Sequence, residues 1–254
     1  MAAQRLGQHF LTRRRLLERI AEAACPGREP LVVEIGAGRG ALTQFLLARA
    51  ERVVAIEIDA ALVEGLRQKF QAETRLTLIQ ADVLKTSLDE WGPAVIAGSL
   101  PYYITSPILR GILRLGPRWR RAVLLVQREV AERLTARPGS REYGYLTVQT
   151  NFFAVPEMLF QAPPAAFSPR PKVDSAAVRL TPRSQSDNWG MREPERFLEF
   201  VGRCFRHKRK TLRNNLREVL GQQVEGWPEA GLRAEQLSLE QFIELYQRIE
   251  SLGH

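Results

Sequence analysis

A short apolar run followed by a cluster of glycines constrains the fold of this chain more than any other feature. Leu31–Ile35 has the composition of a buried strand, residues 36–40 read GAGRG, and residues 41–50 have helical composition. Such a loop brings backbone N–H groups and a helix N-terminus against a ligand without interference from Cβ atoms. The pattern predicts a strand, a nucleotide-type loop and a helix.

Further strand-like runs alternate with helical stretches along the chain. They lie at residues 53–57, 76–80, 95–98, 122–126 and 176–180. This alternation predicts an α/β fold with a mostly parallel sheet covered on both faces. Residues 181–190 are polar and turn-rich, and the sequence after them has only helical periodicity. We therefore expect an α/β domain over residues 1–183 and a small all-helical domain over residues 184–254.

The charge balance points to a polyanionic partner. The 254 residues carry 37 Lys+Arg against 28 Asp+Glu, a formal net charge of +9, while 44% hydrophobic residues exclude a disordered chain. Seven cations and no acid lie between Arg203 and Arg217. A solvated basic face is the alternative, but this excess is more than solubility requires. The candidate nucleic-acid phosphate ligands are Arg206, Lys208, Arg209, Lys210 and Arg213.

Other classes of protein are disfavoured by what the sequence lacks. No window approaches the roughly 18 apolar residues of a membrane span. Cys25 and Cys204 are the only cysteines, and with three histidines they cannot build a zinc site or a disulfide framework. We expect a cytoplasmic monomer that binds neither metal nor membrane.

Two carboxylates are placed to bind a nucleoside cofactor. Glu57 closes the second strand 21 residues after Gly36, where it can accept both hydroxyls of a ribose. Gly36, Gly38 and Ala41 also satisfy the G-x-G-x-x-A pattern, so NAD and S-adenosylmethionine fit equally at this point. Asp82 follows the third strand, where it could accept from an adenine amino group or cap a turn.

The tetrapeptide Ser99-Leu100-Pro101-Tyr102 is the most specific local signal. It is similar to the D/N/S-P-P-Y motif of methyltransferases that act on exocyclic amines of nucleobases. The Ser99 hydroxyl and the Leu100 carbonyl could accept from the amine, and Tyr102 could stack on the base. The alternative is a polar turn with a buried tyrosine.

Two further segments leave their roles open. Residues 7–11 (GQHFL) could fold over the ligand mouth or pack Phe10 and Leu11 on the sheet. Residues 166–173 form a proline-stiffened loop that fixes Phe167, either as a second stacking surface or as a core residue.

With these motifs in this order, the chain resembles the small-subunit ribosomal RNA adenine-N6 dimethyltransferase family of the KsgA/RsmA type over nearly its whole length. The matching stretches are residues 7–11, 34–43 (EIGAGRGALT), 80–84, 99–102, 126–134 (VQREVAERL), 167–175 (FSPRPKVDS) and 209–216 (RKTLRNNL). The resemblance implies a Rossmann-like S-adenosylmethionine-dependent methyltransferase domain with a small helical C-terminal domain. It also implies dimethylation of two adjacent adenosines near the 3′ end of 16S rRNA during small-subunit assembly.

The resemblance assigns roles to particular residues. It implies that Tyr102 and Phe167 stack on the target base. Two departures stand out: Ser99 occupies a position where the family usually has Asn, and His9 replaces a frequent Asn. The S-adenosylmethionine contacts that it implies are His9, Leu11, Gly36, Gly38, Glu57, Asp82 and Ser99.

Three alternatives remain at this stage. A macrolide-resistance methyltransferase of large-subunit rRNA shares the catalytic domain, although residues 209–216 argue for the small subunit. A non-catalytic assembly factor would keep the fold while Ser99 abolishes transfer. A nicotinamide-dependent oxidoreductase would explain the glycine pattern but neither the Ser99 tetrapeptide nor the basic segment.

Overall fold

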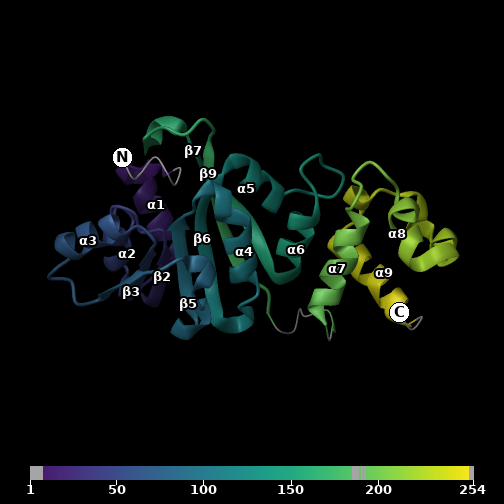
Figure 1. Ribbon diagram of the computed structural model, residues 1–254, viewed down its shortest axis with the longest axis horizontal. Helices are drawn as coiled ribbons and strands as arrows, with labels where there is room; N and C mark the ends of the chain where they lie inside the picture. The colour runs from purple at the N-terminus through teal and green to yellow at the C-terminus, as the bar shows by residue number, and fades with distance from the viewer. Residues whose placement is uncertain (1–7, 185–188, 190, 192, 252–254) are drawn as a thin grey trace. The chain divides into compact units, whose positions relative to one another are not determined.

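The chain divides into two compact units. The computed structural model describes residues 8–184, 189, 191 and 193–251. The first unit comprises the chain up to Ala131 together with Ala154–Pro182, and the second comprises Glu132–Phe153 together with the chain from Arg183 onward (Figure 1). The division falls within α5 (Arg128–Leu134).

A seven-stranded sheet forms the centre of the first unit. Its strands are β2 (Glu29–Ile35), β3 (Ala50–Glu57), β4 (Leu76–Gln80), β5 (Ala94–Ser99), β6 (Trp119–Gln127), β7 (Ala154–Ala162) and β9 (Ser175–Pro182). Their spatial order is β4-β3-β2-β5-β6-β9-β7. The pairs from β4 through β6 are parallel, whereas β9 is antiparallel to both neighbours. The predicted mostly parallel α/β sheet is confirmed.

The strand order places a ligand crevice. From β2 the chain runs outward to β3 and β4 on one side, then returns to β5 and β6 on the other. In open parallel sheets ligands bind where the order reverses, beyond the carboxyl ends of the strands. In this sheet the reversal lies between β2 and β5, so the segments after Ile35 and Ser99 lie next to each other.

Four helices accompany the strands of the first unit: α1 (Arg14–Ala24), α2 (Thr43–Leu47), α3 (Ala60–Lys69) and α4 (Thr105–Leu113). Helix α1 buries Leu17, Ile20, Ala21 and Ala24, which recur at helical spacing and join a core cluster with residues of β2, β3, β5, β6 and β9. Helix α3 is capped by Asp59, whose carboxylate accepts from the N–H groups of Ala61 and Leu62. No helix among residues 8–184 and 193–251 is long and apolar enough to cross a bilayer.

The second unit is helical and has its own core. It contains α6 (Tyr145–Phe153), α7 (Pro194–Cys204), α8 (Leu212–Leu220) and α9 (Leu239–Ser251). The rings of Phe152 and Phe197 lie 4.8 Å apart in this core. The unit thus takes in residues 132–153, which the sequence analysis assigned to the α/β domain. The difference arises because Val148 and Phe152 pack with residues far along the chain, which local periodicity does not report.

Candidate active site

A pocket of about 200 Å³ lies at the carboxyl ends of β2, β3 and β5. The glycine loop, the segment after β4 and residues 8–11 complete its wall. It brings together many of the residues that the sequence singled out: His9, Leu11, Gly36, Gly38, Glu57, Asp82, Ser99 and Leu100. These residues come from separate segments, and they meet because parallel strands end at the same edge of the sheet.

The glycine loop has a backbone that side chains would obstruct. Gly36 and Gly38 have φ angles of +73° and +57°, in the left-handed region that favours glycine. A Cβ on Gly38 would lie 3.0 Å from the ring of Phe10. The Phe10 ring therefore lies directly on the glycine loop. The guanidinium of Arg39, which is a residue of that loop, lies 4.7 Å from the centre of the ring.

Glu57 connects the loop to the end of β3. Its side chain is only 5% exposed, and its Oε2 accepts from the Gly38 N–H at 2.9 Å. Its Oε1 accepts from the N–H groups of Ile58 at 2.9 Å and Asp59 at 3.0 Å. A carboxylate has about four acceptor sites, so capacity remains on the pocket side. The sequence indicated a ligand-binding role and missed this structural one.

Glu34 lines the pocket and was not among the predicted site residues. It is 1% exposed, and the Thr43 hydroxyl donates to its Oε2 at 2.6 Å. Burial raises the pKa of Glu34 to about 8, with a smaller contribution from the Glu57 charge, while the Thr43 hydrogen bond acts in the opposite direction. Glu34 lies one residue before the end of β2, just ahead of the glycines, and this position could have indicated from the sequence that it lines the pocket.

Asp82 caps the turn after β4. Its Oδ1 accepts from the Leu84 N–H at 3.0 Å, and within the described residues no hydrogen bond to Oδ2 is present. Two exposed apolar side chains line the pocket beside the two carboxylates: Ile58, 49% exposed, and Leu84, 46% exposed. Sequence reasoning missed both, because an apolar residue at or shortly after the end of a strand reads as part of the core.

The Ser99 tetrapeptide lies where β5 ends. The Leu100 N–H donates to the Leu125 carbonyl at 3.0 Å, so the backbone here is fixed to β6. The Tyr102 hydroxyl and the Ser175 hydroxyl are hydrogen-bonded at 2.7 Å, and the Tyr102 ring stacks on His9 with a centroid distance of 5.9 Å. Burial raises the pKa of Tyr102. Tyr102 is thus held at its hydroxyl and at its ring, although the pocket wall itself includes Tyr103 instead.

The N-terminal segment and the proline-stiffened loop meet in space. β1 (Phe10–Leu11) pairs antiparallel with β8 (Phe167–Ser168), and His9 Nδ1 lies 2.9 Å from the Pro169 carbonyl oxygen. Of the two roles left open, residues 10–11 fill both, because Phe10 lines the pocket while Leu11 is also buried in the core. Phe167 is 5% exposed and belongs to the same core cluster, so the structure does not bring it to the pocket wall. Its stacking role stays a prediction.

The basic segment lies in the helical unit, from the end of α7 into α8. Arg206 pairs with Glu218 at 2.9 Å, and Lys208 lies 3.6 Å from Glu235. Arg209, Lys210 and Arg213 are exposed, and none has an ion pair with another described residue. The five predicted phosphate ligands therefore divide into two that are paired with carboxylates and three that have no ion pair with another described residue. No group of three or more His, Cys, Asp or Glu side chains in the described parts of the chain could hold a metal ion.

Comparison with known proteins agrees with this geometry. The model of the family "Ribosomal RNA adenine dimethylase" matches residues 2–251. The "Ribosomal RNA small subunit methyltransferase A" of Acidobacterium capsulatum is 42% identical, over 97% of this chain and 90% of that protein. The protein of the same name from Levilactobacillus brevis is 39% identical, over 100% of this chain and 92% of that protein.

Solved structures extend the likeness to the fold. A dimethyladenosine transferase from Plasmodium falciparum superposes with a TM-score of 0.84 at 26% identity, covering 96% of this chain and 98% of that one. The 23S rRNA methyltransferase ErmE gives a TM-score of 0.73 at 30% identity, covering 92% and 98% of the two chains. The resemblance inferred from the motifs is confirmed, and the nicotinamide alternative is excluded. The chain belongs to the ribosomal RNA adenine dimethylase family and is an rRNA adenine methyltransferase.

Proposed function

We propose that this chain transfers methyl groups from S-adenosylmethionine to N6 of two adjacent adenosines near the 3′ end of small-subunit rRNA, acting as a cytoplasmic monomer. One observation carries the proposal: Ser99 and Leu100 line the same pocket as Glu57 and Asp82. The groups that would accept hydrogen bonds from the target amine therefore lie in the same pocket as those that would bind the nucleoside of the cofactor. The curated relatives named for the small subunit support the choice of RNA.

The pocket residues fit S-adenosylmethionine, which supplies an electrophilic methyl group when bound. The remaining acceptor capacity of Glu57 suits a ribose hydroxyl, and the Asp82 Oδ2 suits the adenine amino group. The exposed side chains of Ile58 and Leu84 offer apolar surface in the same pocket, against which a flat base would pack. The left-handed backbone at Gly36 and Gly38 leaves room for the rest of the ligand.

The tetrapeptide would prepare the amine. The lone pair of an adenine amino group is delocalised into the ring, so it must be localised before it attacks. The Ser99 hydroxyl and the Leu100 carbonyl would accept from the two N–H groups, and Tyr102 would fix the base by stacking. A strong general base is not required, since the proton is lost after the new N–C bond makes the nitrogen cationic.

Mass spectrometry of ribosomal RNA tests the proposal. Undermethylated small subunits and matched large subunits are each incubated with the protein and S-adenosylmethionine, and the RNA is digested and sequenced by mass. We expect two dimethylated adenosines in the small-subunit RNA and none in the large-subunit RNA. Methylation of the large subunit alone would favour the activity named for ErmE, and no methylation of either would contradict the proposal.

A further inference from the structure

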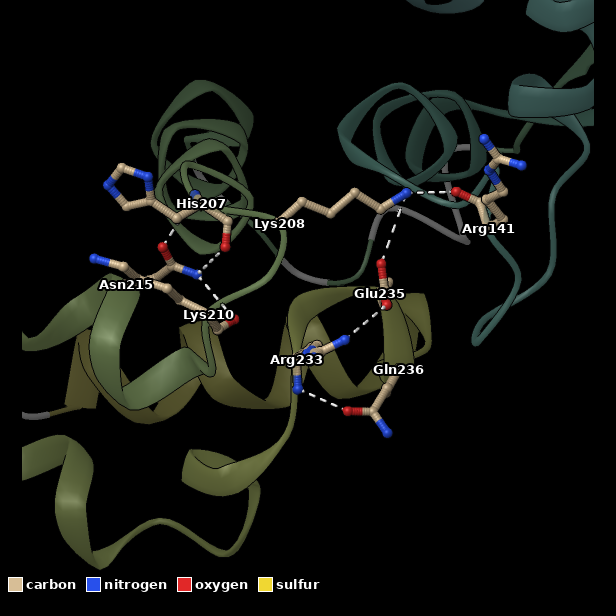
Figure 2. Close-up of polar contacts among 8 residues, drawn as sticks. All are labelled: Arg141, His207, Lys208, Lys210, Asn215, Arg233, Glu235 and Gln236. Carbon is tan, nitrogen blue, oxygen red and sulfur yellow. Dashed lines mark hydrogen bonds and ion pairs between the residues drawn. The ribbon is translucent and has the colours of Figure 1, made fainter.

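The turn between α7 and α8, residues 205–210, carries four of the predicted phosphate ligands and is held by one buried amide. Asn215 of α8 is 6% exposed. Its Oδ1 accepts from the His207 N–H at 3.1 Å, and its Nδ2 lies 2.9 Å from the Cys204 carbonyl oxygen, 3.2 Å from that of His207 and 3.4 Å from that of Lys210. Figure 2 shows the amide pointing into the turn. We call residues 205–210 the basic turn.

This arrangement addresses a specific difficulty of the basic turn. Exposed cations close together repel one another, and a loose loop would also lose conformational freedom on binding RNA. A single side chain that bonds to backbone groups at both ends of the turn removes most of that freedom in advance. The amide uses its acceptor and both of its donors on the turn, so its polar atoms have little capacity for another ligand.

Lys208 differs from the other cations of the basic turn. Its Nζ donates to the Arg141 carbonyl and lies 3.6 Å from the Glu235 carboxylate (Figure 2). Glu235 is fixed in turn, because its own carbonyl accepts from the Gly139 N–H at 2.6 Å. To bind a phosphate, Lys208 would have to give up the Glu235 carboxylate, which would keep only its longer contact with the Arg233 guanidinium at 4.0 Å. Arg209 and Lys210 have no such competitor among the described residues.

We infer that Asn215 is a positioning residue for rRNA binding, which holds the basic turn so that Arg209 and Lys210 serve as phosphate ligands while Lys208 anchors the turn internally. The inference rests on the proposed function, since it takes small-subunit rRNA as the polyanion. It narrows the sequence-based expectation, in which Lys208 and Lys210 had equal roles.

A matched pair of lysine variants tests the division of roles. Binding of the full-length protein to undermethylated small subunits is measured over a range of salt for the parent, Lys208→Gln and Lys210→Gln. Each phosphate contact contributes about 0.7 to 0.9 to the slope of log affinity against log salt. We expect Lys210→Gln to lower the slope by about that amount and Lys208→Gln by less than half of it. Equal decreases would overturn the assignment of Lys208.

Asn215→Ala and its neighbour Asn214→Ala test the clamp, since Asn214 is exposed on the same helix. We expect Asn215→Ala to raise KM for small subunits about tenfold and to lower the salt slope, with kcat and S-adenosylmethionine affinity unchanged. Asn214→Ala should match the parent in all four quantities. Circular dichroism selects a temperature at which the variants are folded, and Asn215→Ser serves as a milder substitution if Asn215→Ala is unfolded.

The outcomes separate two kinds of failure. If the Asn215 variants show a lower kcat or a weaker affinity for the cofactor in addition to a raised KM, the residue has a general structural role and the inference is overturned. An unchanged salt slope in a folded Asn215 variant would overturn it equally. If the parent itself does not bind small subunits, the proposed function fails instead.

Discussion

The pocket and the basic turn both gather charged side chains, but they hold them in opposite ways. In the pocket, Glu57 is 5% exposed and accepts from three backbone N–H groups. In the basic turn, Arg209 and Lys210 are exposed, and the side chain that holds them in place is the neutral Asn215. The pocket fixes its charge by burial, whereas the turn fixes only its backbone.

This difference has energetic consequences. A buried acceptor removed from its donors leaves each donor unsatisfied, at about 1 to 3 kcal/mol, and salt screens it little. An exposed cation contributes less by itself and is strongly screened, so many are needed together. Substitutions in the pocket should therefore change the chemical step or cofactor affinity, whereas substitutions in the turn should be overcome by excess RNA.

The largest effect is expected at Tyr102. Tyr102→Ala should slow transfer by between a hundred- and a thousandfold, about 3 to 4 kcal/mol, because the base loses its platform. Ser99→Ala should slow it by about ten- to a hundredfold, since the Leu100 carbonyl remains, and Ser99→Asn should retain or raise the rate. The rate of methyl transfer in each variant is measured in single-turnover reactions at saturating small subunits. Tyr102→Phe is the control, because it keeps the ring and loses only the bond to Ser175.

If excess small subunits restored the Tyr102→Ala rate, Tyr102 would act in binding like the basic turn. A Ser99→Asn variant much slower than the parent would show that this site is built around serine.

The next effect concerns the close approach of β2 and β5 under the pocket. A Cβ on Gly98 would lie 2.3 Å from the Ile35 carbonyl oxygen, so Gly98→Ala should lower the free energy of unfolding by about 3 kcal/mol. Gly111 in α4 has nothing within 4 Å of its Cβ position, and Gly111→Ala should stabilise by about 0.5 to 1 kcal/mol. Urea denaturation of both variants decides. Similar stabilities would mean that the strands at the pocket yield as readily as a surface helix.

Glu57→Ala should weaken S-adenosylmethionine binding by about ten- to a hundredfold, or about 1.5 to 3 kcal/mol, because a charged acceptor is lost. It should also lower the melting temperature, since the N–H groups of Gly38, Ile58 and Asp59 lose their acceptor. Calorimetry at low and high salt measures the affinity, with the exposed Glu64→Ala as control. Unchanged affinity in a folded Glu57→Ala protein would remove this residue from the cofactor site.

The last effect, the smallest when it is taken over a single pH unit, is a dependence of stability on pH that arises from Glu34. Its pKa is about 8 in the folded protein against an ordinary value of 4.5, so between these values the folded state binds more protons than the unfolded state. The stabilisation is complete below pH 4.5 and declines as the pH rises towards 8, by up to about 1.4 kcal/mol for each pH unit. Glu34→Gln cannot titrate and should remove this decline.

Urea denaturation of the parent and Glu34→Gln near the two ends of that pH range checks the sign. The variant should gain stability relative to the parent as the pH rises. A constant difference would show that Glu34 is already ionised in the folded protein.

The sequence by itself determined the local elements of the site. The glycine loop, Glu57, Asp82 and the Ser99 tetrapeptide each follow a strand-like run, and parallel strands end at one edge, so their convergence was predictable. Periodicity indicates which residues are buried within a strand or helix, and this local property is sufficient to predict the strands of a mostly parallel sheet. The basic segment was likewise visible, because charge density is also local.

The tertiary structure alone decided which partner each residue has. β1 pairs with β8 across more than 150 residues, Glu132–Phe153 joins the helical unit, and Lys208 lies against Glu235. Two cations that look alike in the sequence, Lys208 and Lys210, differ because among the residues that the structure describes only Lys208 has a carboxylate beside it. Such pairings depend on how distant segments pack, and a one-dimensional pattern of residue types contains no direct record of that packing.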